Sequence, residues 1–430
     1  MCYNYLRKRV IGDFNWMIQR PRYKKWLDEF REKKLIKVLT GLRRSGKSTI
    51  LDMYVESLKA CGVAEDRIVY INFEMLEAEP LTDPVKLHKK ILDSLVPGKM
   101  TYVFLDEVQH VTEYEKVMDS LYVREGIDLY ITGSTADLLS SEIASRLTGR
   151  YVEINVLPLS FKEYVSGRGN TGGDVRRLFS DYITYGGMPG ALDFPNGSSA
   201  QREYIEFVFR TIIEKDVLKR TKKGRFLVER IIRYLASNVG SLTSAKRLTD
   251  RLAEDGGYRK DGAPAYNTVT SYLERLDDCF FFYKADRFDV RGGEHLKLIN
   301  KYYLTDFGFK YYILHNPTLE LQQIVENVVF FELKRRRYKV STGKVDDREV
   351  DFVVQGDDGR MRYIQVAVSV ADEEKLKQEL AVFEAIKDNY PKYLLTLDDV
   401  FVADHDGIRT LNIIDFLLER TNVNEESDIG

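Results

Sequence analysis

The 430 residues of the chain suffice for two to four globular domains, and 44% hydrophobic with 31% charged residues excludes a disordered or fibrous protein. Lys+Arg 65 against Asp+Glu 67 give a net charge of −2, so any nucleic-acid contact must come from local basic patches. The three cysteines are scattered and lack metal-ligand spacing, and the N-terminus is polar. No apolar run approaches the roughly 20 residues of a membrane helix. These features together predict a reduced, cytoplasmic protein.

Short apolar segments alternate with amphipathic ones between residues 35 and 158. Five segments have the length and apolar character of buried strands: 35–41, 67–74, 101–109, 127–134 and 151–158. Residues 48–62 and 83–96 are two of the intervening helices. Strands this apolar are buried on both faces. The pattern therefore predicts an α/β fold in which helices cover both faces of a parallel sheet.

The chain becomes mostly helical beyond residue 165, with Gly-rich breaks such as 167–173. Three amphipathic helices over residues 225–279 precede two strands around the turn 289–294, and three helices with a hairpin are typical of a winged-helix module. A helix carrying Glu326, three strands, another helix and a last strand then predict a small α/β domain at the C-terminal end.

The segment GLRRSGKST, residues 41–49, fits the pattern G-x-x-x-x-G-K-[ST] of a phosphate-binding loop. It lies between a predicted strand and a predicted helix, which is the context that this Walker A motif requires. Lys47 would bridge β- and γ-phosphates, and the Ser48 hydroxyl would bind Mg²⁺. We expect nine nucleotide-binding residues: Gly41, Leu42, Arg43, Arg44, Ser45, Gly46, Lys47, Ser48 and Thr49.

A second part of the site follows the apolar strand of YVFLDEVQH, residues 102–110. Asp106 would hold the magnesium ion through water, and Glu107 would orient and activate the attacking water. Adjacent carboxylates at a strand end are otherwise often a solvated turn, but the Walker A sequence upstream favours a Walker B motif. The two motifs together predict hydrolysis of a nucleoside triphosphate.

The strand in ITGSTADLL, residues 131–139, ends in hydroxyl side chains. If it lies between the two Walker strands, Ser134, or less favourably Thr132, points at the γ-phosphate as a sensor, and capping of the following helix is the alternative. Arg146 and Arg150 are candidates to stabilise charge in the transition state, within the subunit or across an oligomer interface. Each could equally be a surface arginine that closes a helix.

The chain resembles a large group of prokaryotic predicted AAA+ ATPases over nearly its full length. The resemblance is carried by stretches that appear in the order and spacing of that group: RPRYKKWLDEF, LIKVLTGLRRSGKSTIL, FLDEVQ, ITGSTADLLSSEIASRLTGR, LPLSFKEY and YGGMPG. The resemblance implies ATP as the nucleotide and a P-loop sheet whose sensor strand lies between the Walker strands. It also implies winged-helix and restriction-endonuclease-like parts. We accordingly expect four domains: an ATPase domain 1–165, a helical extension 166–225, a winged-helix module 226–312 and a nuclease-like α/β domain 313–430.

Two basic runs, residues 214–225 and 333–339, are candidates for contacts with nucleic-acid phosphates, and solvated helix faces are the alternative. Four side chains on one face of the third winged-helix helix could enter a major groove: Asn267, Thr270, Ser271 and Arg275. The same helix carries Glu274, Asp277 and Asp278, which repel phosphate. A protein partner is therefore an equally favoured interpretation.

The C-terminal domain resembles nucleases of the PD-(D/E)xK type, which need an acid on one strand, an acid or glutamine with a lysine two positions later on the next, and often a helical glutamate. Asp351, Gln365 and Glu326 fit three of these positions, but alternation places Ala367 where the lysine should be. We predict a nuclease-like fold that does not cut. A lysine donated from another strand, or a different register, would restore the chemistry.

The sequence thus predicts an ATP- and Mg²⁺-dependent ATPase whose hydrolysis drives or times a conformational change in the C-terminal modules. Two alternatives remain: a nucleotide-gated DNA-binding regulator in which slow hydrolysis resets the state, and an active DNA nuclease fused to its own motor. A homo-oligomer is expected if an arginine acts in trans.

Overall fold

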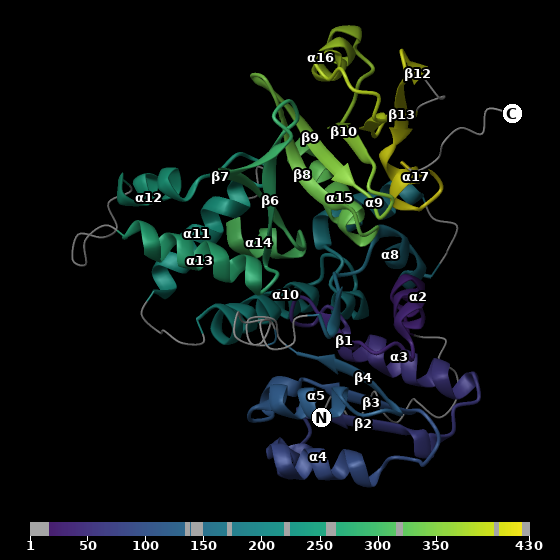
Figure 1. Ribbon diagram of the computed structural model, residues 1–430. Coiled ribbons are helices and arrows are strands. Elements are labelled where there is room, and N and C mark those ends of the chain that lie inside the picture. The colour runs from purple at the N-terminus through teal and green to yellow at the C-terminus, as the bar shows by residue number, and fades with distance from the viewer. Residues whose placement is uncertain are drawn as a thin grey trace, which may run out of the picture.

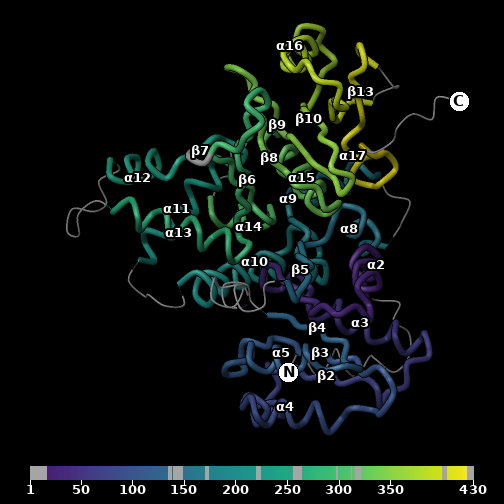
Figure 2. The backbone as a smooth tube through the Cα atoms, viewed as in Figure 1, coloured from purple at the N-terminus to yellow at the C-terminus, as the bar shows by residue number. Residues whose placement is uncertain are grey.

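The computed structural model describes residues 17–133, 138, 149–169, 174–218, 224–254, 264–314, 321–399 and 404–423 of the chain. One β-sheet lies at each end of the molecule, with a mainly helical region between the two sheets (Figure 1). The backbone trace shows the same arrangement (Figure 2). None of the described helices is long and apolar enough to span a bilayer.

The N-terminal sheet has five parallel strands in the order β2-β3-β4-β1-β5. Its strands are β1 (Ile36–Thr40), β2 (Ile68–Asn72), β3 (Thr101–Asp106), β4 (Ile127–Thr132) and β5 (Tyr151–Asn155). The strand β4 therefore lies between β1, which leads into the Walker A motif, and β3, which ends in the Walker B motif. This order confirms the expected P-loop arrangement.

Helices cover both faces of the five-stranded sheet. Side chains at alternate positions enter opposite apolar clusters: Val103 and Leu105 join one cluster, and Tyr102 and Phe104 join the other. The helical elements are α2 (Pro21–Phe30), α3 (Lys47–Ala60), η2 (Glu65–Arg67), η3 (Leu76–Thr82), α4 (Pro84–Asp93), η4 (Val108–His110) and α5 (Tyr114–Tyr122). The first cluster receives side chains of α4 and α5, and the second receives those of α2 and α3. This two-sided burial explains why the strands are apolar throughout.

A mainly helical segment follows β5. It begins at Ser160, whose hydroxyl accepts from the Glu163 N–H while the Glu163 carboxylate accepts from the Ser160 N–H, so a capping box fixes the helix start. The elements are α8 (Phe161–Gly167), α9 (Val175–Tyr185), η5 (Pro189–Asp193), α10 (Ser199–Ile212) and the π-helix η6 (Ile213–Val217). Because η6 continues α10 directly, the two form one long element above the N-terminal sheet (Figure 1).

Three helices and a hairpin come next, as predicted. They are α11 (Arg225–Ser237), α12 (Ala245–Glu254), α13 (Tyr266–Asp278), and the antiparallel strands β6 (Phe282–Asp289) and β7 (Glu294–Leu304). The elements of a winged helix are thus present in the expected order. Their assignment as a winged-helix module stays a prediction.

The C-terminal sheet has eight strands in the order β12-β13-β11-β10-β9-β8-β6-β7. Its remaining elements are α14 (Gly308–Leu314), α15 (Leu321–Arg335), β8 (Lys339–Val345), β9 (Arg348–Gln355), β10 (Met361–Ala367), α16 (Glu373–Glu384), β11 (Lys392–Thr396), β12 (Asp404–His405), β13 (Ile408–Asn412) and α17 (Ile413–Leu417). The strand β6 runs parallel to β8, so one sheet crosses the boundary expected between residues 312 and 313. One apolar core also extends from α8 to α17.

Candidate active site

The phosphate-binding loop joins β1 to α3 and turns on two glycines. Gly41 and Gly46 have φ angles of 135° and 99°, which favour glycine. A Cβ on Gly41 would lie 2.2 Å from the Val156 carbonyl oxygen, so only glycine fits beside the segment that follows β5. Because α3 begins at Lys47, its unpaired N–H groups lie next to the loop. This is the backbone geometry with which helix N-termini bind phosphate.

The Lys47 ammonium is buried within the loop. Its Nζ donates to the carbonyl oxygens of Gly41 at 2.9 Å and Leu42 at 3.2 Å. Burial lowers the pKa of Lys47, while the Glu107 carboxylate acts in the opposite direction. An anionic phosphate would add the counter-charge that a buried ammonium favours. The position therefore fits the phosphate-binding role predicted for this lysine.

Asp106 ends β3 and receives hydrogen bonds from three other elements. Ser48 Oγ donates at 3.1 Å, Asn72 Nδ2 donates at 3.0 Å, and the Thr132 hydroxyl also donates to this carboxylate. Burial raises the pKa of Asp106, and the hydrogen bonds from Thr132 and Ser48 lower it. The structure thus brings together the two predicted metal residues, Ser48 and Asp106.

A hydroxyl and a carboxylate are oxygen donors of the type that Mg²⁺ prefers. Within the described ranges, no group of three or more His, Cys, Asp or Glu side chains could hold a metal by itself. Magnesium sites of nucleotide-binding proteins use one or two protein ligands with phosphate oxygens and water. Ser48 and Asp106 therefore fit a magnesium site that nucleotide phosphates complete.

Glu107 follows β3 in a left-handed backbone conformation, with φ of 56°. Its N–H donates to Thr132 Oγ1 at 2.9 Å, and Gln109 Nε2 donates to its carboxylate at 2.5 Å. A non-glycine residue in this conformation costs about 1–3 kcal/mol and is common at functional sites. Thr132 thus holds the backbone of Glu107 and Gln109 holds its carboxylate, and the sequence analysis gave neither residue this role.

The sensor and arginine predictions have different outcomes. Thr132, the less favoured sensor candidate, bonds to the Walker B segment, whereas Ser134 and Arg146 lie outside the described residues. Arg150 precedes β5, and its carbonyl accepts from the N–H of Ile36 at the start of β1. Five residues of β1, about 16 Å at 3.3 Å each, separate this point from the phosphate-binding loop.

This position does not favour a role for Arg150 at the phosphates of its own subunit, and that role stays a prediction. Its side chain instead pairs with Asp119, with 2.7 Å between Nη1 and Oδ1. This pairing lies at the edge of the sheet opposite to the Walker motifs, because parallel strands share their direction. A role across an oligomer interface stays a prediction for Arg146 and Arg150.

The two arginines of the phosphate-binding loop contact the element formed by α10 and η6. Arg43 donates from Nε and Nη2 to the two carboxylate oxygens of Asp216, at 3.0 and 2.9 Å. The Arg44 guanidinium lies 5.1 Å from the centre of the Phe207 ring. No signal in the sequence pairs Asp216 with the loop, because 173 residues separate Asp216 from Arg43. These contacts connect the loop directly to the helical segment.

A third arginine, Arg20, which precedes α2, also contacts the phosphate-binding loop. Its Nη1 donates to the Ser45 carbonyl at 3.0 Å, and its Nη2 donates to the Leu157 carbonyl at 2.9 Å. Its guanidinium also pairs with Glu163 at 3.1 Å, and the side chain is buried. Arg20 therefore connects the phosphate-binding loop, the segment after β5 and helix α8.

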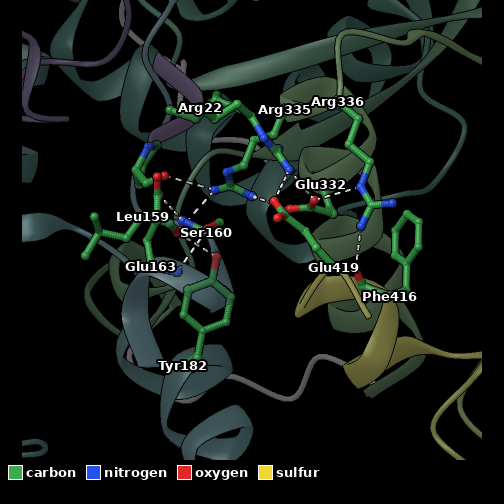
Figure 3. Close-up of polar contacts among 12 residues, drawn as sticks. Arg22, Leu159, Ser160, Glu163, Tyr182, Glu332, Arg335, Arg336, Phe416 and Glu419 are labelled. Carbon is green, nitrogen blue, oxygen red and sulfur yellow. Dashed lines mark hydrogen bonds and ion pairs between the residues drawn. The ribbon is translucent and has the colours of Figure 1, made fainter. Parts of the chain in front are cut away.

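The basic run 333–339 makes intramolecular contacts. Arg335 Nη2 donates to the carbonyls of Pro158 at 3.0 Å and Leu159 at 3.2 Å, while Arg336 pairs with Glu332 and donates to the Phe416 carbonyl (Figure 3). These arginines join α15 to the segment after β5 and to α17. Binding of nucleic acid through this run stays a prediction, although three of its cations, Arg335, Arg336 and Arg337, already have internal partners.

The other predicted nucleic-acid elements are only partly described. Residues 219–223 of the basic run 214–225 lie outside the described residues, and Arg225 pairs with Glu229 at 2.8 Å. On α13, Asn267 is exposed, whereas Arg275 Nη1 lies 3.5 Å from the Val217 carbonyl. The predicted recognition face is thus not uniformly open.

The C-terminal cluster contains the predicted acids and a lysine that the sequence analysis did not identify. Lys301, on β7, places Nζ 2.9 Å from Glu326 and 3.8 Å from Asp351, and it also pairs with Glu349 at 2.7 Å. Burial and the charge of Glu326 raise the pKa of Asp351, while Lys301 lowers it. A lysine from another strand is thus present, but its ammonium is paired with the same acids.

The other positions of the expected nuclease pattern lie on β10. Gln365 donates from Nε2 to Glu379 at 2.9 Å, and its Oε1 accepts from the Asp351 N–H at 3.3 Å. Ala367 is fully buried in an apolar cluster with side chains of α16. No lysine from β10 itself enters this part of the described structure.

Comparison with known proteins identifies two family matches. Residues 33–165 match the AAA domain family, and residues 176–320 match a domain of unknown function (DUF8612). The first match covers the five-stranded sheet and both Walker motifs. The N-terminal part of the chain is therefore an AAA domain.

Two relatives extend over most of the chain. An uncharacterized protein of Haemophilus influenzae is 34% identical over 411 residues, which are 94% of this chain and 99% of that protein. An uncharacterized protein of Methanocaldococcus jannaschii is 27% identical over 395 residues, covering 85% and 80% of the two chains. Among solved structures, the Walker-type ATPase PABY2304 of Pyrococcus abyssi has a TM-score of 0.49 and 18% identity, over 69% of this chain and 96% of that one.

Proposed function

We propose an ATPase function for this chain, which carries an AAA domain at residues 33–165 and belongs to the same family as the uncharacterized protein of Haemophilus influenzae. The observation that carries the proposal is the hydrogen-bonded group around Asp106, in which Ser48 and Thr132 donate to one carboxylate. Lys47 and Glu107 flank this group. A site with a phosphate-binding lysine, a magnesium pair and a fixed carboxylate has the parts that phosphoryl transfer to water requires.

Each side chain has a separate role in this proposal. Lys47 and the loop amides bind the β- and γ-phosphates, and Ser48 with Asp106 holds Mg²⁺, which when bound neutralises charge on the phosphates. Glu107, positioned by Gln109, accepts the proton of the attacking water. Thr132 keeps Asp106 and Glu107 in register, because its hydroxyl bonds to both residues.

Replacement of Lys47 by alanine tests the site. A hydrogen bond to a charged group contributes about 1.5–3 kcal/mol, so Lys47→Ala should weaken ATP binding by about 10–100-fold and abolish turnover. Lys59→Ala, at the exposed end of the same helix α3, is the matched control and should behave as the wild type. Binding is measured with a fluorescent ATP analogue and turnover by phosphate release. Wild-type turnover in Lys47→Ala would remove the basis for the proposal.

We also propose that the nucleotide state is transmitted from the loop to the C-terminal part. Arg43 and Asp216 connect the loop to η6, which leads toward α11. Arg20 and Arg335 both donate to the Pro158 carbonyl, so the loop and α15 share one anchoring point. A shift of the loop on nucleotide binding would therefore change contacts to two C-terminal elements.

A DNA-cleaving C-terminal part is the second candidate, and the presence of Lys301 beside Asp351 favours it. We nevertheless propose that this part does not cut DNA. The Lys301 ammonium is paired with Glu326 and Glu349, so it neutralises carboxylates instead of facing a substrate. The cleavage assay described below separates the two candidates.

A further inference from the structure

A cavity of about 510 Å³ lies where the AAA domain meets the C-terminal part. It is lined by α2, by α8 and its N-cap, by the end of α15 with the two residues that follow, and by Glu419 beyond α17. This volume is within the range of sites for small organic ligands, which is about 300–1,000 Å³. The cavity lies outside the Walker motifs, because none of their residues lines it.

The lining is strongly basic. Two carboxylates, Glu163 and Glu419, face six cations: Arg22, Lys25, Lys162, Arg335, Arg336 and Arg337. The charged side chains that pair with the lining residues do not cancel this positive charge. Adding Arg20, Glu29 and Glu332 gives seven cations and four carboxylates among the described residues. A positive excess in a partly enclosed space favours an anionic ligand.

Two arginines at the cavity have donors without a partner in the described structure. Nε of Arg335 and Nη1 of Arg22 are buried and make no hydrogen bond there, although Nη2 of Arg335 donates to two carbonyls. The Arg335 side chain is only 5% exposed, so this Nε is shielded from bulk solvent. Figure 3 shows Arg22 and Arg335 approaching Glu332 from two different helices. Buried donors of this kind normally have an acceptor. Oε2 of Glu332, 3.9 Å from Nη1 of Arg335, is likewise buried without a hydrogen bond, so the inference of an anionic ligand rests chiefly on the excess of cations around the cavity.

The basic lining and the volume of the cavity define the class of ligand. Guanidinium groups bind phosphate oxygens through paired N–H donors, and the dianion of a phosphate monoester suits an excess of about three cations. The partly buried ring of Trp26 lines the same cavity and offers an apolar surface beside the cations. The volume exceeds the needs of a bare phosphate ion, so an organic group of the ligand would occupy the remaining space.

We propose that this cavity is a second ligand site, for a small phosphorylated molecule whose phosphate binds to the arginines of α2 and α15. The site is adjacent to the phosphate-binding loop, because Glu163 lines the cavity and pairs with Arg20, which donates to the Ser45 carbonyl. Occupation of the cavity therefore strengthens the contact between the AAA domain and the C-terminal part. The proposal does not depend on ATP hydrolysis.

The test uses AMP, inorganic phosphate and adenosine as probes of full-length Lys47→Ala in isothermal titration calorimetry. AMP lacks the β-phosphate that the Walker A loop cradles, and the substitution removes the loop lysine. AMP is expected to bind with one-to-one stoichiometry, inorganic phosphate to bind more weakly, and adenosine not to bind. Inorganic phosphate that binds as tightly as AMP would assign the site to the free ion. Absence of binding by AMP and phosphate alike would overturn the proposal.

A double variant at the cavity rim locates the binding. Lys25→Gln with Lys162→Gln removes two cations that are exposed or half-exposed, so the fold should be retained, and AMP affinity should fall about tenfold. Lys24→Gln is the matched control, because Lys24 is on the same helix, pairs with Asp28 and does not line the cavity. Unchanged affinity in the double variant, or an equal loss in the control, would refute this location. ATP binding by the double variant should stay at the wild-type level, which separates this site from the Walker site.

Discussion

Replacement of Lys301 by methionine measures what the cation contributes to the C-terminal cluster. The side chain is 4% exposed, and its Nζ lies within 4 Å of Glu326, Glu349 and Asp351. Methionine retains much of the volume of lysine but leaves three carboxylates without their cation. Removal of one partner of a buried ion pair costs about 3–5 kcal/mol. For a cooperative unit of 150–250 residues, this loss corresponds to a fall in Tm of roughly 6–20 °C.

The loss of stability depends on pH in a defined direction. Burial and Glu326 raise the pKa of Asp351 in the wild type, and Lys301 counteracts them. Without Lys301 the pKa of Asp351 rises further, so the folded variant binds more protons than its unfolded chain at pH values above the ordinary carboxylate pKa. The stability of the variant therefore falls as the pH rises through this range. The difference from the wild type should be larger near pH 8 than near pH 5.

Differential scanning calorimetry at these two pH values tests both expectations. Lys284→Met is the matched control on the same hairpin, because the Lys284 side chain is 39% exposed and its ammonium pairs with Asp286 at the surface. A surface ion pair contributes about 0–1 kcal/mol, so the control should unfold close to the wild type. Equal Tm values for Lys301→Met and the control near pH 8 would refute the reasoning. A difference that grows toward pH 5 would contradict its electrostatic part.

Three further predictions concern catalysis. Glu107→Gln should retain ATP binding but hydrolyse ATP about 10²–10⁴-fold more slowly in a phosphate-release assay, and failure to bind ATP would make Glu107 a structural residue. If Arg146 or Arg150 acts in trans, it is expected to change the rate of ATP hydrolysis by about 10³–10⁵. Turnover per subunit should then fall when the protein is diluted. Turnover that stays constant through the concentration range in which the oligomer dissociates would exclude this role. Purified protein with Mg²⁺ or Mn²⁺ should not cleave supercoiled, linear or single-stranded DNA, with or without ATP. Cleavage that is lost in Asp351→Ala would establish the nuclease alternative.

The Walker site could be predicted from sequence to the extent that its contacts are local. Lys47 and Ser48 follow a glycine-rich loop at fixed spacing, and the apolar strand before Asp106 places this acid at the same edge of a parallel sheet. Asn72 and Asp216 could not be identified in this way. Each reaches the site from another element, and neither belongs to a recurring local pattern that specifies its partner. The order of strands and the packing of η6 against the loop decide these contacts.

The distinction between local patterns and contacts from distant segments also applies to the basic run 333–339. A sequence can show that cations are clustered, but their partners determine whether the cluster is a binding surface. Arg335 and Arg336 bond to carbonyls from distant segments, at Pro158 and Phe416, and so contribute to internal packing. The number of charged residues along the chain cannot distinguish a binding surface from internal packing. Every residue has a carbonyl oxygen that can accept from arginine, so the sequence does not show which of them does.

The C-terminal cluster shows why a missing motif residue is insufficient evidence for lost activity. The spacing of two residues on β10 places Ala367 where the nuclease pattern has a lysine, but β7 brings Lys301 to the acids from more than 60 residues earlier in the chain. What decides between catalysis and neutralisation is the pairing of that lysine. An ammonium bonded to Glu326 and Glu349 cannot orient water or bind a phosphate without leaving the buried carboxylate of Glu326 unpaired, at a cost of several kcal/mol. Cleavage of DNA would therefore require Lys301 to break these pairs, and this cost is an independent reason to expect an inactive site.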